Sequence, residues 1–232
     1  REVYQRLFAR FGPQNWWPGD TPLEVMVGAV LTQSVNWGNV ERAISNLKAA
    51  GALSPRALRE VPPEALATLI RPAGYYQAKA RKLKALAQLI GTARDDLGQL
   101  FSGDTWELRE RLLRVYGVGE ETADSILLYA AGRAVFVIDA YTRRIVGRLG
   151  LALPTAPYRE LQGLFMDHLP ADAALYNEYH ALLVRLGKDV CRKTAPRCPA
   201  CPLEDMCPYP AEAAPPASTR PRLAANRVKA LQ

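Results

Sequence analysis

All four cysteines of this chain lie in one short segment, which limits how its C-terminal part can fold. They are Cys191, Cys198, Cys201 and Cys207, with six, two and five residues between them. A disulfide scaffold is disfavoured because we expect an intracellular, cytoplasmic protein. Four thiolates in one loop suit a tetrahedral zinc ion or a [4Fe–4S] cluster, and the spacing alone leaves both open.

The rest of the chain has the apolar periodicity of helices. A run at 134–138 is β-prone, but no partner strand is visible, so we expect it to be extended and to end at Asp139 as a helix N-cap. The expected helices fall within 23–50 (two, broken near 34–36), from Ser54-Pro55, from Pro62-Pro63, and at 75–90, 104–115, 120–131, 157–169 and 171–187.

The charge of the chain favours a polyanionic partner. Its 30 Lys and Arg against 23 Asp and Glu give a formal charge of +7. Within 71–94 there are basic residues, including Lys79 and Arg81, and no acidic one. A solvated helix face is the alternative explanation of this stretch. No apolar run reaches the roughly 20 residues of a bilayer span, so we expect no membrane partner.

Gly117-Val118-Gly119 joins two expected helices and lets the backbone approach a phosphate closely. Alone, this is a common tight turn. The wider string 112–124 resembles the helix-hairpin-helix of the endonuclease III superfamily, with Val137-Ile138-Asp139 at the family's interval. The cysteine segment is similar to that family's cluster loop, and the resemblance runs from about Trp16 to Cys207.

This resemblance implies an all-α protein with two helical domains flanking a DNA-binding cleft, a helix-hairpin-helix and a [4Fe–4S] cluster held by the four cysteines. The expected domains are 23–133, and 1–22 with 134–208; a disordered basic tail follows at 209–232. The implied partner is damaged double-stranded DNA, bound by a monomer. The DNA-binding candidates are Gly117, Val118, Gly119, Gln33, Tyr75, Lys79, Arg81 and Arg143, with Gln33 and Tyr75 placed to wedge the gap left by an extruded base.

The implied activity is excision of a damaged base by a DNA glycosylase. The family's catalytic aspartate corresponds to Asp139, which can stabilise a cationic sugar and orient water. An ordinary helix cap is the alternative role. Where bifunctional members carry a lysine that forms a Schiff base, this chain has Glu121, which has no amine. We therefore expect a monofunctional glycosylase with Asp139 and Glu121 as its catalytic candidates.

Trp16-Trp17-Pro18 and the segment 23–33 look closer to the 3-methyladenine glycosylase branch, which is similar in carrying Glu at the Glu121 position. Cationic alkylated purines can stack on electron-rich indoles, so Trp16, Trp17 and Trp37 are candidates for the base pocket. Core packing is the alternative for each tryptophan.

Two other functions compete with this interpretation. One is a bifunctional glycosylase and abasic-site lyase on oxidised pyrimidines. The other is a non-catalytic binder of DNA lesions, in which Glu121 marks lost chemistry. Activity on defined lesions, followed by alkali to reveal uncut abasic sites, separates the three.

The cysteine segment generates the first testable prediction. The purified protein should be brown and should contain close to four irons per chain, as the family resemblance implies, measured by absorption and elemental analysis. Replacing Cys198 or Cys201 should unfold the second domain, since metal binding and local folding are coupled. A colourless protein with one zinc per chain would overturn the cluster assignment.

Overall fold

The computed structural model describes residues 1–209, and in this range the chain is built from helices and turns without a strand. The prediction of an all-α fold is confirmed. The predicted basic tail at 209–232 lies outside the described residues apart from Tyr209. None of the helices within 1–209 has the length and apolar character needed to cross a membrane.

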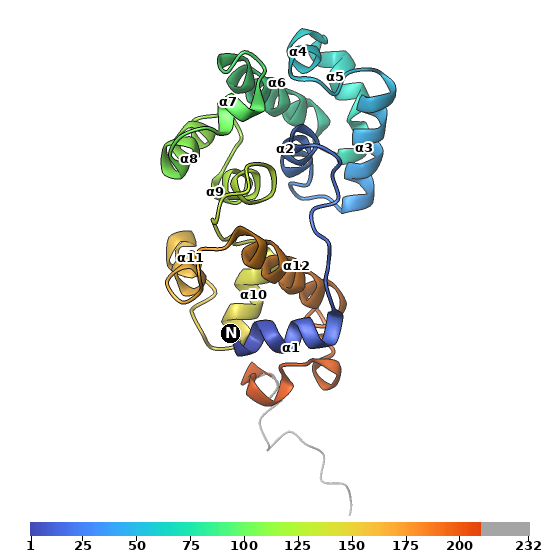
Figure 1. Ribbon diagram of the computed structural model, residues 1–232. Coiled ribbons are helices and arrows are strands. Elements are labelled where there is room, and N and C mark those ends of the chain that lie inside the picture. The colour runs from blue at the N-terminus through green and yellow to red at the C-terminus, as the bar shows by residue number, and fades with distance from the viewer. Residues whose placement is uncertain (210–232) are drawn as a thin grey trace, which may run out of the picture.

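The first of two hydrophobic cores is formed by the middle of the chain, drawn at the top of Figure 1. It takes side chains from Leu23 to Leu127 and also Val135. The elements of this part are α2 (Pro22–Leu31), α3 (Trp37–Ala49), α4 (Pro55–Glu60), α5 (Pro63–Leu69), the 3-10 turn η1 (Arg71–Ala73), α6 (Tyr76–Thr92), α7 (Leu97–Phe101), α8 (Thr105–Leu113) and α9 (Glu120–Ser125).

The second core combines the two ends of the described chain. Leu7 packs there with side chains from Leu128 to Leu203, and α1 lies alongside α12 (Figure 1). The elements of this part are α1 (Glu2–Phe11), α10 (Ala140–Arg148), α11 (Tyr158–Met166), α12 (Ala173–Asp189) and the 3-10 turns η3 (Cys198–Ala200) and η4 (Glu204–Met206).

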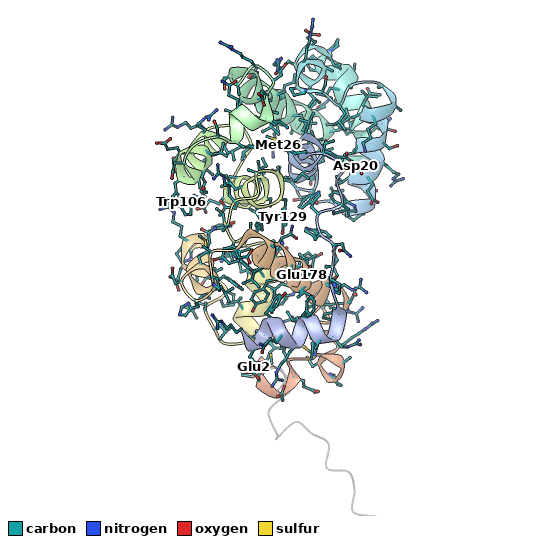
Figure 2. The ribbon with its side chains drawn as sticks, viewed as in Figure 1. Glu2, Asp20, Met26, Trp106, Tyr129 and Glu178 are labelled. Atoms are coloured by element: carbon teal, nitrogen blue, oxygen red, sulfur yellow. The ribbon has the colours of Figure 1, made fainter. Side chains whose placement is uncertain are left out.

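The boundary between the cores falls inside one π-helical turn, η2 (Ile126–Ala130). Ile126 and Leu127 belong to the first core, and Leu128 belongs to the second. The wider π-helical turn changes the direction in which successive side chains leave the helix axis. The next residue, Tyr129, lies in the zone between the two parts, as Figure 2 shows.

Local sequence signals set the starts of several helices as predicted. Ser54 caps α4 by accepting a hydrogen bond from the Ala57 N–H, and proline occupies the first position of that helix. The run Val135–Ile138 has no regular secondary structure and is buried. It leads into Asp139, whose Oδ1 accepts a hydrogen bond from the Thr142 N–H at 2.7 Å at the start of α10.

A buried ion pair connects the hairpin helices to the second part. Arg109 of α8 donates from Nε to Asp124 Oδ1 of α9 at 2.6 Å, with side chains 3% and 0% exposed. Gln162 of α11 donates to Asp124 Oδ2 at 2.9 Å and to the Phe136 carbonyl at 2.7 Å. This network therefore ties α8, α9, α11 and the segment before Asp139 together.

The network generates the second prediction. Arg109→Met should lower the free energy of unfolding by about 3–5 kcal/mol, because it leaves the Asp124 carboxylate buried without a countercharge. Arg114→Met, at the exposed C-terminal end of the same helix, should change it by no more than about 0.5 kcal/mol. Urea denaturation of both variants measures this, and equal small effects would contradict the role given to the pair.

Candidate active site and DNA-contact surface

Asp139 lies where the segment 135–138 enters α10, close to residues of both parts. Its side chain is 13% exposed, and its Oδ2 lies 3.7 Å from His180 Nε2 of α12. The Thr142 N–H holds the other oxygen. The predicted N-cap geometry is present, and the second carboxylate oxygen is left to face His180.

Glu121, in the first turn of α9, lies close enough to Asp139 for their charges to interact. Partial burial, and then the nearby Asp139 carboxylate, raise the pKa of Glu121 to about 7. The residue still has an exposed surface. Repulsion between the two carboxylates raises the pKa of Glu121 even where solvent reaches it.

The three predicted pocket tryptophans form one cluster with Tyr129. Trp17 is central: its ring centroid lies 5.6 Å from that of Trp16, 5.3 Å from Trp37 and 5.1 Å from Tyr129. Gly28 of α2 forms part of the support, since a Cβ there would lie 3.4 Å from both Trp17 and Trp37. The structure thus brings together Trp16, Trp17 and Trp37, all half-buried.

Tyr129 and His180 connect this cluster to Asp139, and sequence reasoning missed both. The Tyr129 hydroxyl lies 2.5 Å from His180 Nδ1. Burial, and secondarily the Asp139 charge, raise the pKa of Tyr129 well above its usual value, and burial lowers the pKa of His180. No spacing signal could have linked two residues 51 positions apart.

The hairpin turn is held from α2 and α6. Gly117 has a φ of +81°, a left-handed backbone that favours glycine, and the side chain of Lys82 covers the position that a Cβ would take. Gln33 donates from Nε2 to the Gly117 carbonyl at 3.1 Å and to Thr122 Oγ1 at 3.0 Å. Gly119 is open, with nothing within 4 Å of the position of a Cβ. Val118 is buried in the first core.

The prediction that Lys79 contacts DNA is contradicted by its burial. Lys79 is 2% exposed, and its ammonium donates to the carbonyls of Leu31, Gln33 and Ala73 at 2.9, 2.8 and 2.7 Å. Burial lowers its pKa to about 8. Lys79 satisfies carbonyls at the end of α2 and in η1, so it is not available to a phosphate.

The other predicted contact residues differ in their surroundings. Arg81 is exposed. Tyr75 is 78% exposed and has a left-handed backbone with φ of 43° directly before α6. Gln33 is half-buried and engaged with the hairpin. Arg143 donates from Nη1 to the carbonyls of Pro154 and Ala156, which fixes the loop after α10.

The four cysteines, none of which is disulfide-bonded, line one cavity in the second part. Within residues 1–209, no three thiol, imidazole or carboxylate groups are arranged around a single ion. Arg148 donates to Cys191 Sγ at 3.2 Å and so brings a positive charge to this cavity.

Comparison with known proteins establishes the family. The model of the HhH-GPD superfamily of base excision DNA repair proteins matches residues 27–171. The chain belongs to this superfamily. The resemblance to endonuclease III is thereby confirmed, and the protein is a glycosylase of the base excision repair class.

Several relatives of this HhH-GPD protein match most of its length. A Methanocaldococcus jannaschii protein named "Putative DNA repair glycosylase MJ1434" is 46% identical over 89% of this chain and 94% of its own. Endonuclease III of Escherichia coli is 28% identical over 82% of this chain and 84% of its own. The H. pylori 3-methyladenine DNA glycosylase (MagIII) bound to 1,N6-ethenoadenine has a TM-score of 0.69 and 28% identity, covering 81% of this chain and 96% of its own.

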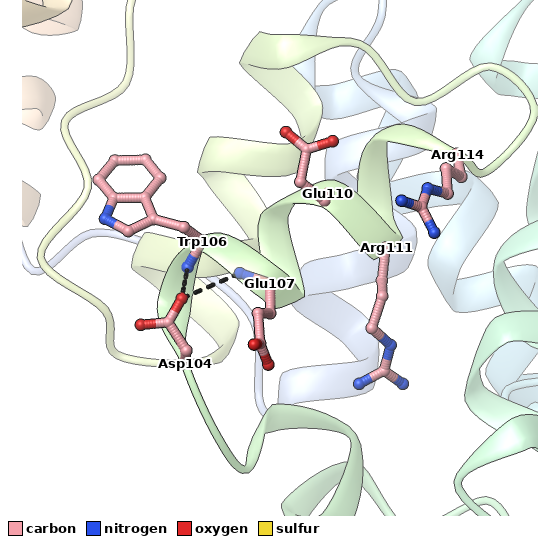
Figure 3. A pocket seen from close by; sticks show the side chains of 6 residues that line it. All are labelled: Asp104, Trp106, Glu107, Glu110, Arg111 and Arg114. Carbon is pink, nitrogen blue, oxygen red and sulfur yellow. Dashed lines mark hydrogen bonds between the residues drawn. The ribbon is translucent and has the colours of Figure 1, made fainter.

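A separate hollow on this glycosylase lies along the outer face of α8 (Figure 3). There Asp104 caps the helix by accepting from the N–H groups of Trp106 and Glu107. The hollow is open to solvent and includes none of the residues near Asp139. The residues that line it are Asp104, Trp106, Glu107, Glu110, Arg111 and Arg114.

The raised pKa of Glu121 generates the third prediction. The folded pKa of about 7 exceeds the ordinary value of 4.5. The contribution of Glu121 to the free energy of unfolding is therefore fully present below pH 4.5 and is lost as pH rises through about 7. Glu121→Gln should therefore gain melting temperature relative to the unaltered protein as pH rises through this window. The gain should then stay constant above pH 8. An equal difference at pH 5 and pH 8 would contradict the shift.

Proposed function

We propose that this glycosylase removes a damaged base by attack of water, assisted by Asp139, and without efficient lyase action. The observation that carries the proposal is the Asp139 carboxylate, mostly buried between the two parts of the fold with Glu121 and His180 beside it. Base loss develops positive charge on the sugar. A carboxylate with little exposure to water stabilises that charge strongly and can orient or deprotonate the attacking water.

Glu121 supports the monofunctional mechanism. Schiff-base chemistry needs an amine at this position, and a carboxyl cannot form that bond. With a pKa of about 7, Glu121 is partly protonated near neutral pH. The neutral form limits repulsion between this carboxyl group, Asp139 and the DNA phosphates, so Glu121 can lie near Asp139 while DNA is bound.

We propose alkylated purines as the preferred class of base. The half-buried cluster of Trp16, Trp17 and Trp37 offers indole rings, whose electron-rich faces bind a cationic base by stacking and cation–π attraction. The similarity to a 3-methyladenine glycosylase bound to an ethenoadenine, at 28% identity over most of both chains, supports this class.

The DNA surface that we propose uses the hairpin and the start of α6. The open backbone at Gly119 suits a phosphate, Gly117 shapes the turn that presents it, and Arg81 is exposed to meet another phosphate. Tyr75 is an exposed aromatic side chain that can fill the gap left by an extruded base. Gln33 supports this surface by holding the hairpin turn. Arg143 supports the region of Asp139 by holding the loop after α10.

We further propose that Cys191, Cys198, Cys201 and Cys207 hold a [4Fe–4S] cluster. The common cavity of the four thiols supports this assignment. When bound, the cluster would crosslink the loop, and the loop residues Arg192, Lys193 and Arg197 would supply positive charge for DNA docking. Arg148 contributes from this chain by hydrogen-bonding one thiolate and by stacking on Tyr209, its guanidinium carbon 4.2 Å from the ring centroid.

The fourth prediction tests the chemistry. On duplexes containing 3-methyladenine or 1,N6-ethenoadenine, the protein should leave abasic sites that are cut only after alkali. Asp139→Asn should lower the single-turnover excision rate by about two to four orders of magnitude, because it removes the carboxylate charge with little change in size. DNA affinity, measured by anisotropy, should change far less.

Borohydride should trap little covalent enzyme–DNA complex. Glu121→Lys is the matched variant, and any trapping it gains reports an amine placed near the sugar, although that amine also needs a lowered pKa. Efficient trapping by the unaltered protein would exclude the monofunctional mechanism. The same protein can be tested on a panel of duplexes that contain alkylated or oxidised bases. If it binds these lesions but excises none of them, it is a non-catalytic lesion binder.

A further inference from the structure

His180 is a buried histidine whose outer nitrogen has no partner. Its side chain is 6% exposed, and Nε2 has no hydrogen-bond partner although Asp139 Oδ2 lies 3.7 Å away. Its inner nitrogen, Nδ1, contacts the Tyr129 hydroxyl. An unpaired buried polar atom is costly unless another state of the site satisfies it, and here the nearby group is the proposed catalytic carboxylate.

The surroundings determine which nitrogen carries the proton. If Nδ1 carried it, Nε2 would direct a lone pair at the Asp139 carboxylate, and two acceptors would face each other. If Nε2 carries it, the Tyr129 hydroxyl donates to Nδ1 and the Nε2–H is directed at Asp139. The indole N–H of Trp16 is a donor only and has no hydrogen-bond partner, so it leaves the Tyr129 hydroxyl proton for His180.

The protonation states of the two side chains agree with this arrangement. Burial keeps the imidazole neutral by lowering its pKa, with the Asp139 charge opposing, and Tyr129 retains its proton because its pKa is raised. A neutral imidazole has one N–H. The hydroxyl of Tyr129 therefore selects the tautomer of His180.

We propose that His180, fixed as its Nε2–H tautomer by Tyr129, is a positioning residue that orients Asp139 for base excision. This rests on the proposed function of Asp139. The Thr142 N–H holds Oδ1 at 2.7 Å, and His180 faces Oδ2. Catalytic hydrogen bonds are often long without substrate and tighten in the complex, so the 3.7 Å separation closes when DNA is bound.

A first experiment measures the tautomer directly. The chain has two histidines, and the other, His168, is exposed, so nitrogen-15 labelling of histidine gives one buried signal and an internal control. At pH 7.5, His180 should show a protonated Nε2 and an unprotonated Nδ1. A protonated Nδ1, or an imidazolium, at His180 would overturn the proposal.

A second experiment uses matched variants. A glutamine amide nitrogen reaches the position of Nε2, whereas an asparagine nitrogen reaches only that of Nδ1. His180→Gln should keep excision within a few-fold of the unaltered rate, and His180→Asn should lose roughly 10- to 100-fold in single-turnover rate with unchanged DNA affinity, as expected for a misplaced catalytic group. Melting temperatures check that both variants fold. Equal rates for the two variants would refute a positioning role.

Combination with Asp139→Asn separates this proposal from the proposed function. In that background His180→Asn should cause no further loss of rate, because the group it positions is absent. A full additional loss would refute the coupling. If Asp139→Asn itself leaves excision unchanged, the proposed function fails, while the tautomer measurement still tests the Tyr129–His180 pair.

Discussion

The ion pair between Arg109 and Asp124 is the interaction on which the arrangement of the two parts depends. A buried carboxylate is tolerated only when charge and hydrogen bonds surround it, and here those partners come from both cores. Gln162 extends the network to the Phe136 carbonyl, three residues before Asp139. The hairpin that we propose for DNA contact and the segment that carries Asp139 are thus held in one network.

The boundary between the cores is also where the chemistry-bearing side chains collect. Glu121, Tyr129, Asp139 and His180 come from α9, η2, the start of α10 and α12. Each is ordinary within its own element: a first-turn acid, an aromatic residue, an N-cap and a helix-interior histidine. Packing two helical parts together gives them shared neighbours. The altered pKa values of Glu121, Tyr129 and His180 follow first from burial and second from the Asp139 charge.

Lys79 illustrates how composition can mislead. Counted with its basic neighbours, it looked like part of a charged surface, but its spacing to Leu83, Leu86 and Ile90 places it on the apolar face of α6. That periodicity, rather than the charge of the side chain, predicts that Lys79 is buried. The ammonium is accepted there because it satisfies three carbonyls at the end of α2 and around η1. The neighbouring basic residue Lys82 is likewise used inside the fold, because its side chain covers Gly117.

Local rules in the sequence determined the all-α class, the helix starts at Ser54 and Asp139, and the grouping of the cysteines. These features depend on spacing, capping and proline or glycine chemistry within a few residues. Tertiary structure decided that Lys79 is buried, that Gln33 holds the hairpin turn, and that Tyr129 and His180 connect Trp17 to Asp139. Those outcomes depend on contacts between residues far apart in the chain, which only the packing of the two cores creates.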